Sequence, residues 1–288
     1  CIRDRLHATR ARVEAAGDGA FQLALAELML EEQSGDIVGP SVWSGWHNVG
    51  GMDVAVSFTP VSGLIDLNSA PEGLLHNLFA SIAELEGITA DELAGNVIEW
   101  RSARAGPGVV TQPVSGAVSV WNRGQVSGGV LGGTGFRTIE DLLQVPGVNR
   151  RIFEAVEDAV SVSQGGQASV DWRSAPVAVL KALGDMDDSA AMEVVGVRWD
   201  EFADATAALA VPDGIDLTFQ GTGTVSSYRA DALVKTDAAV FRRRQWVSRE
   251  LVGNDGLPWS FFRTEAVEVA SPTEKEIMAG IEVAHAGN

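Results

Sequence analysis

Residues 64–78, LIDLNSAPEGLLHNL, recur as residues 169–183, SVDWRSAPVAVLKAL, and this internal repeat decides the fold prediction. Each copy reads as the start of a helix, because a proline is tolerated in the first turn and because Ser69 with Glu72 matches a capping box. The second copy repeats this start without the glutamate. We therefore predict a block containing two related helical units. The identical pairs are Asp66/Asp171, Ser69/Ser174, Ala70/Ala175, Pro71/Pro176, Leu75/Leu180 and Leu78/Leu183.

Two further helix starts lie between the copies, at Thr89-Ala-Asp-Glu92 and Thr138-Ile-Glu-Asp141. Short connections at Gly87-Ile-Thr89 and Pro146-Gly-Val-Asn149 are each expected to join two helices. Between them, residues 106–135 carry nine glycines, two prolines and a single charge. That composition excludes a regular helix and leaves either a long ordered loop lying on a partner or, as the favoured interpretation, a flexible insertion.

Outward from this block, the pattern indicates a helix followed by strands. Residues 3–33 place apolar side chains mostly three or four positions apart, which predicts one helix, and Gly17 and Gly19 in its middle imply that it depends on packing. A loop rich in Gly, Pro and Trp follows, and residues 52–59 then alternate as a half-buried strand. Later strands are predicted at 215–225, 228–236, 240–251 and 259–269, with a hairpin turn at Asn254-Asp-Gly256.

The fold class is therefore α+β. Four divisions are predicted: a helix with the first strand, an inserted helical domain, the remaining strands and a tail, at 1–63, 64–210, 211–270 and 271–288.

Charge and composition exclude several classes of protein. The 39 acidic and 21 basic side chains give a net charge of −18, which argues against nucleic-acid binding and against attraction to anionic membranes. The single cysteine, Cys1, excludes a disulfide within the chain. The most apolar run, residues 21–30, is too short to span a membrane. Because the sequence opens on Cys rather than Met, we expect a further segment upstream of Cys1.

The sequence lacks the familiar catalytic motifs. There is no phosphate-binding glycine loop, no dinucleotide fingerprint, no Gly-x-Ser-x-Gly and no His-Glu-x-x-His. A hydrolase would have to assemble scattered carboxylates such as Glu84, Glu86 and Asp91, which nothing in the sequence sets apart. We predict a protein that is not an enzyme and that requires no cofactor.

Two charged runs are the candidates for local function. Asp185-Met-Asp187-Asp188 is similar to the start of a calcium loop, but the loop's sixth-place glycine and twelfth-place glutamate are missing. A helix cap by Asp187 or Asp188 is the favoured interpretation, and calcium held by Asp185, Asp187 and Asp188 is the alternative. Residues 242–244, three arginines on a predicted strand, alternate between faces and are expected to pair with nearby carboxylates.

Trp43 and Trp46 are the aromatic candidates for contact with a partner. Both fall in the predicted loop after the first helix. Large aromatic side chains often anchor protein interfaces, so we expect these two to touch another protein.

The residues also resemble a known family. Residues 65–71, Ile-Asp-Leu-Asn-Ser-Ala-Pro, and residues 136–147, Phe-Arg-Thr-Ile-Glu-Asp-Leu-Leu-Gln-Val-Pro-Gly, each followed by helices, are similar to the K-type minor pseudopilins of bacterial type II secretion systems. The resemblance covers nearly the whole chain, including the helix end Ala24-Leu-Ala-Glu-Leu28 and the returning strands. The family's apolar membrane segment and its cleavage site are missing from this sequence.

The resemblance implies a pilin-like fold, in which a long helix lies on an antiparallel sheet that is enlarged by a helical domain. It implies a tip component of the pseudopilus that assembles with other minor pseudopilins, with a body in the periplasm and an inner-membrane anchor upstream of Cys1. On this view the helix buries Phe21, Leu25 and Leu28 against its own sheet and against partner helices, and the bulky insert hinders further growth at the tip.

A DNA-binding helix-hairpin-helix protein of the competence-receptor type is the alternative, because such modules share the Asn-Ser-Ala-Pro motif. Their Gly-x-Gly hairpins present backbone N–H groups to a phosphate, with lysines nearby. Here the hairpins read Gly87-Ile-Thr89 and Gly147-Val-Asn149 without the second glycine, and residues 64–160 carry 12 acidic against 6 basic groups. We therefore interpret both hairpins as structural.

Overall fold

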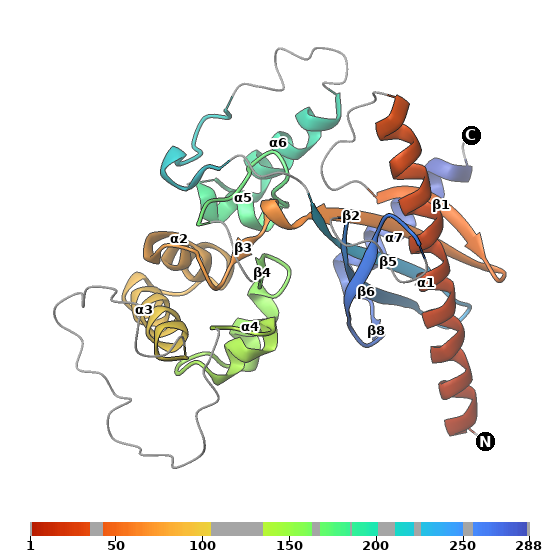
Figure 1. Cartoon of the computed structure of the whole chain (residues 1–288), viewed down its shortest axis with the longest axis horizontal. Coiled ribbons are helices and arrows are strands. Elements are labelled where there is room, and N and C mark those ends of the chain that lie inside the picture. Colours follow the sequence, from red (N-terminus) through yellow and green to blue (C-terminus); the bar gives the residue numbers. More distant parts are fainter. Residues whose placement is uncertain are drawn as a thin grey trace.

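The computed structural model places a long helix and an antiparallel sheet beside a group of shorter helices (Figure 1). It describes residues 2–34, 43–104, 135–162, 168–184, 186–200, 211–221, 226–249 and 256–286. Residues 106–134, which include most of the predicted glycine-rich insertion, lie outside the described part.

Helix α1 (Ile2–Ser34) lies along one face of a six-stranded sheet. The order is β1-β2-β5-β6-β7, β8 also pairs with β6, and every pair is antiparallel. The strands are β1 (Trp43–Val49), β2 (Met52–Pro60), β5 (Ser227–Lys235), β6 (Val240–Ser248), β7 (Ser260–Thr264) and β8 (Glu268–Val269).

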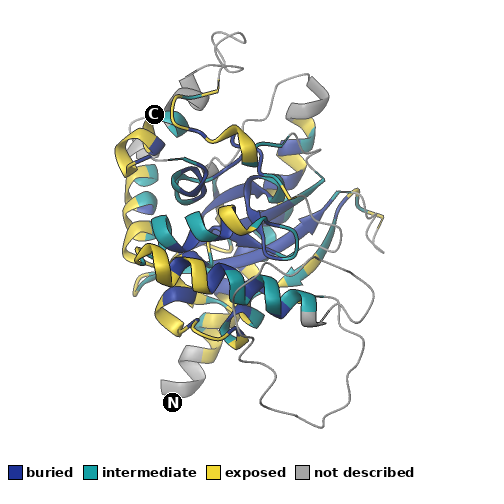
Figure 2. Cartoon of the chain, turned by 90° about the vertical axis from the view of Figure 1, so that its left-hand side faces the viewer, coloured by how far each residue is buried: buried dark blue, intermediate teal, exposed yellow. Residues whose placement is uncertain are grey.

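Helices cover both faces of this sheet, which explains why its central strands are buried along nearly their whole length (Figure 2). On β2, Val54, Val56 and Phe58 pack in one core with α1, whereas Ala55 packs in a second core with helix α7 (Pro272–Ala286). Neighbouring strand residues point to opposite faces, so α1 and α7 lie on opposite sides of the sheet.

The long helix and the strands at 52–59, 228–236 and 240–251 are confirmed as α1, β2, β5 and β6 as far as the structure describes them. The predicted strand 259–269 is divided into two short strands, β7 and β8. Residues 254 and 255 of the predicted hairpin turn lie outside the described part. Residues 271–288, predicted as a tail, contain α7.

Two predictions about strands were wrong. Part of the predicted Gly/Pro/Trp loop is strand β1, which joins β2 through Gly50 and Gly51, both at positive φ (60° and 77°). A two-residue turn of that kind matches the twist of a hairpin, so the Gly-Gly pair was the signal for the missed strand. The predicted strand 215–225 is absent over its described residues, where Leu217–Phe219 form a 3-10 turn capped by Asp216.

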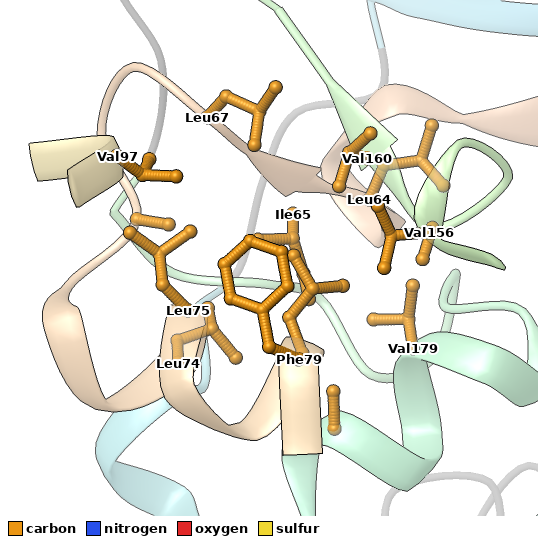
Figure 3. Packing of buried hydrophobic residues seen from close by; sticks show 14 of the residues in the cluster. Leu64, Ile65, Leu67, Leu74, Leu75, Phe79, Val97, Val156, Val160 and Val179 are labelled. Atoms are coloured by element: carbon orange, nitrogen blue, oxygen red, sulfur yellow. The ribbon is translucent and has the colours of Figure 1, made fainter. Parts of the chain in front are cut away.

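The helical part follows β2 and precedes β5. It consists of η1 (Val61–Gly63), β3 (Ile65–Asp66), α2 (Glu72–Asn77), η2 (Leu78–Ile82), α3 (Gly87–Arg104), η4 (Ile139–Gln144), α4 (Arg150–Val156), β4 (Val160–Ser161), α5 (Val177–Leu183), α6 (Asp188–Asp200) and η7 (Leu217–Phe219). Among these, η2 is a π-helical turn and β3 pairs with β4 in parallel. One hydrophobic core unites them, and Figure 3 shows Leu64, Ile65, Val160 and Val179 around Phe79.

The repeat forms the same turn twice, although its predicted capping box was wrong. Helix α2 starts after Pro71, and Ser69 Oγ instead donates to Asp66 Oδ2 at 2.8 Å. In the second copy, Ser174 Oγ donates to Asp171 Oδ2 at 3.4 Å. Each aspartate also accepts the backbone N–H two residues on, at 3.1 Å, as in an Asx-turn. The shared Asp and Ser therefore build the turn that leads into each helix.

The second copy packs against the two residues that precede the first copy, Ser62 and Gly63. The backbone N–H of Asp171 donates to the carbonyl of Ser62 at 2.8 Å. A Cβ at Gly63 would lie 2.1 Å from the Ser174 carbonyl oxygen, so this contact needs a glycine. The repeat thus folds as two halves of a single core.

The predicted box at Thr138 and Asp141 is confirmed at the start of η4. Asn149 caps α4 by accepting the Ile152 N–H at 3.0 Å. The predicted connection at 146–149 therefore does join two helical elements. The other predicted connection, at 87–89, was placed too late: these residues already belong to α3, which begins at Gly87, and the connection is made by residues 83–86.

Candidate partner-binding site

The inner face of α1 is fixed to the sheet of its own chain. Phe21, Leu25 and Leu28 are 0%, 1% and 6% exposed in the core beneath the helix. Their burial against the sheet is as predicted, and their contact with partner helices stays a prediction.

Glycines let this helix lie close to the strands. A Cβ at Gly17 would come within 2.9 Å of the Arg243 side chain, and one at Gly19 within 3.1 Å of Val49. Gly17 and Gly19 weaken the helix by their propensity, but they allow it to pack closely on the strands.

Polar contacts also hold α1 in register. Asp18 accepts from Arg243 Nε at 2.8 Å and from Gln245 Nε2 at 2.9 Å, while Gln22 accepts from Trp259 Nε1 at 3.0 Å. These bonds connect one side of α1 to β6 and to the start of β7. They fix which face of α1 is left for solvent.

The outer face of α1, defined here as Leu23, Ala26, Glu27 and Leu30, is exposed to solvent. Leu23 and Leu30 are 50% and 63% exposed and stand two helical turns apart. Spacing of i, i+3, i+4 and i+7 is the pattern by which one helix docks on another. Sequence reasoning missed these residues because the inner-face residues Phe21, Leu25 and Leu28 form a stronger apolar stripe on the same helix.

The two candidate tryptophans lie on β1 rather than in a loop. Trp46 is half-buried and packs with Ala55, Leu233 and Met278, so the contact that the structure shows for it is within the chain. The side chain of Trp43 lies outside the described part. Partner binding by either tryptophan stays a prediction.

The three successive arginines of β6 pair with carboxylates, as predicted, and alternate between the two faces of the sheet. Arg243 reaches Asp18 under α1. On the other face, Arg244 Nε donates to Asp231 Oδ1 at 2.5 Å, and Arg244 Nη2 lies 2.7 Å from Asp158 Oδ1.

We name the charged group on that second face the Arg–carboxylate cluster. Arg229 joins it through Nε to Asp231 Oδ2 at 2.9 Å. Its members are Arg229, Arg242, Arg244, Glu157, Asp158, Asp231, Glu268 and Glu274.

Burial and pairing shift the pKa values in this cluster. Burial alone would raise the pKa of Asp158 and of Asp231, but Arg244 and Arg229 hold both well below the ordinary range. Glu157 behaves differently, because burial and the neighbouring Asp158 raise its pKa. The paired aspartates are therefore structural anions: Asp231 links β5 to β6, and Asp158 ties the sheet to the end of α4.

The predicted calcium residues divide between a helix cap and an ion pair. Asp187 Oδ1 accepts the Ala190 N–H at 2.8 Å and so caps α6, which confirms the favoured interpretation. Asp188 lies 2.8 Å from Lys181 Nζ, and Asp185 lies outside the described part. In the described ranges, no three His, Cys, Asp or Glu residues are grouped so as to hold a metal. Calcium stays a prediction.

The carboxylates considered for a hydrolase have separate surroundings. Glu84, at a φ of 54°, lines a small cavity with Leu85, Arg151 and Ile152. Asp91 Oδ1 lies 2.6 Å from His76 Nδ1 between α2 and α3.

None of the described helices is long and apolar enough to cross a membrane.

No protein-family model matches this chain, and no curated protein matches its sequence. Among solved structures, it is similar to a chain in "The Crystal Structure of the GspK-GspI-GspJ complex from enterotoxigenic Escherichia coli Type 2 Secretion System". The TM-score is 0.55 at 13% sequence identity, and the match covers 93% of this chain and 99% of that chain. At this identity the likeness shows the fold alone. It supports a GspK-like fold and confirms the pilin-like α+β class.

Proposed function

We propose that this chain is a minor pseudopilin, a subunit of a type II secretion pseudopilus that assembles with other minor pseudopilins and catalyses no reaction. The observation that carries the proposal is the two-sided α1. Its inner face packs against the sheet of its own chain. Leu23, Ala26 and Leu30 of the outer face form another apolar stripe, which is exposed to solvent. A helix that exposes an apolar stripe to solvent is suited to pack against another helix.

The shared fold supports the same proposal. The similar chain belongs to a complex of GspK with GspI and GspJ, and the match extends over nearly all of both chains. A position at the tip, a periplasmic body and an inner-membrane anchor upstream of Cys1 belong to the proposal. The bulk of the helical part, which lies to one side of α1 in Figure 1, would hinder the addition of another subunit there.

The test is binding to the other minor pseudopilins of the same cell. The double variant Leu23→Lys with Leu30→Lys should lower the affinity for the partner at least about tenfold in co-purification. Each lost interface anchor is expected to cost more than about 1 kcal/mol of binding free energy. Ile88→Lys is the matched control, because Ile88 is also an exposed apolar helix residue but belongs to α3. Equal binding by the double variant and the wild type would refute the role of the outer face of α1.

Failure of the wild-type chain to bind any minor pseudopilin would count against the function itself. Tight, salt-dependent binding to duplex DNA would instead favour the helix-hairpin-helix alternative. The two outcomes are separable in one series of binding experiments.

A further inference from the structure

Helix α7 is held to the second face of the sheet by few contacts. Met278 is its one fully buried side chain among residues 272–282, and Ile277 and Ile281 are half-buried beside it. Two ion pairs add to these apolar contacts between α7 and the sheet. They join Glu282 to Lys235 of β5 and Glu274 to Arg242 of β6. A helix that buries so little apolar surface opens more readily than the strands beneath it.

The helical part is fixed to the same face of the sheet through the residues that follow α4. The carbonyl of Asp158 accepts from Arg229 Nη1 at 2.6 Å, and its carboxylate pairs with Arg244 at 2.7 Å and with Arg242 at 3.5 Å. Glu157 Oε1 lies 3.5 Å from Arg242 Nη2.

Arg242 is therefore shared between two structures that are distant in sequence. Its Nη1 lies 3.4 Å from Glu274 of α7 and 3.5 Å from Asp158 after α4, while its Nη2 lies 3.0 Å from Glu268 of β8. The guanidinium side chain is only 11% exposed.

The cover provided by α7 also sets the strength of the other contacts. While α7 is in place, Glu274 and Arg242 are both largely screened from water. Ion pairs strengthen when water is excluded, so departure of α7 would hydrate Arg242 and weaken its hold on its partners. The effect should be larger for Glu157, which is 22% exposed, than for Asp158, which is already 52% exposed. The reverse holds as well, because energetic coupling between two sites is reciprocal.

We propose that Arg242 is a conformational latch that couples α7 to the helical part across the second face of the sheet, so that loosening either one loosens the other. Through Arg242, displacement of α7 would loosen α4, β4 and the Arg–carboxylate cluster. It does not depend on the proposed assembly role.

Hydrogen exchange on the full chain tests the latch from both sides. Asp158→Asn removes a partner of Arg242 on the helical side and should speed amide exchange in residues 272–282 about fivefold or more. Glu154→Gln is its control, because Glu154 pairs with Arg150 within α4, at 2.7 Å, outside the cluster. The control should leave exchange in α7 unchanged.

The second arm starts from α7. Glu274→Gln should speed exchange in residues 150–161 as well as in α7, whereas Glu282→Gln, which breaks the other ion pair of α7, should affect α7 alone. Amides of β2 and β5 report global unfolding and should change less than either target segment. This arm also serves if Asp158→Asn does not fold.

Two results would overturn the latch. One is that Asp158→Asn leaves α7, and Glu274→Gln leaves residues 150–161, exchanging at the wild-type rate. The other is that each control produces the same change as its paired variant.

Discussion

At the residue scale, Gly63 shows how a single missing side chain permits the repeat to close. Its backbone lies against the Ser174 carbonyl of the second copy, and a methyl group there would force the backbone to move. The identities within the repeat mark the turn, but no pattern in the sequence identified the partner of Gly63. That partner is set by tertiary contact 111 positions along the chain.

Gly63→Ala should lower the free energy of unfolding by about 1–3 kcal/mol, the usual cost of overpacking a closed site. Gly95→Ala is the matched control. Nothing lies within 4 Å of a Cβ built at Gly95, which stands inside α3, so the change should stabilise the chain by roughly 0.5–1 kcal/mol through helix propensity. Urea unfolding of both variants measures the change in unfolding free energy, which should be a loss for Gly63→Ala and a gain for Gly95→Ala. Destabilisation of equal size in both would contradict the close contact at Gly63.

Asp231 gives a prediction about pH. Its pKa and that of Asp158 are lowered, so both contribute stability that is complete above the ordinary aspartate pKa of about 3.9 and is lost as pH falls toward the lowered values. Glu157, with a raised pKa, adds a slope of opposite sign just above its ordinary range. Urea unfolding from pH 7 downward should therefore show stability falling most steeply below about pH 4.

Asp231→Asn should cost about 3–5 kcal/mol at pH 7, because it leaves the buried Arg244 without a main partner. The variant should also lose part of the acid-dependent slope. A slope identical to that of the wild type would mean that Asp231 titrates as an ordinary surface carboxylate.

At the scale of elements, the sequence predicted what local patterns encode. The helix over 3–33, three of the strands and the box at Thr138 follow from periodicity and capping, and all are found. Strand β1 was missed because its glycine-bearing segment looks irregular until it pairs with β2. The buried stripe of α1 (Phe21, Leu25 and Leu28) was predicted, but the outer stripe with Leu23 and Leu30 was missed, because the stronger stripe alone accounts for the helical spacing.

The two stripes of α1 should respond differently to truncation. Leu25→Ala removes a fully buried side chain and should cost about 2–5 kcal/mol of unfolding free energy. Leu23→Ala removes a half-exposed one and should change stability by less than about 0.5 kcal/mol. Chemical denaturation of the two variants compares them directly, and similar losses in both would place Leu23 in the core.

At the scale of the whole molecule, one sheet packs against three other parts of the chain. It holds α1 on one face, and α7 and the helical part on the other, with the Arg–carboxylate cluster between the last two. Leu23 of the outer face of α1 belongs to none of these cores, whereas Glu27 of the same face lies 3.7 Å from His47 of β1. This arrangement makes the chain a suitable subunit for an assembly, because partner binding through α1 need not disturb its internal packing.

The most direct test of assembly is the mass of a mixture of this chain with the other minor pseudopilins of its cell, measured by light scattering during size exclusion. Alone, the chain has a mass of 30.3 kDa. The account predicts a single heteromeric species whose mass equals the sum of the different subunits. Separate peaks, each at the mass of one subunit at every concentration reached, would contradict it.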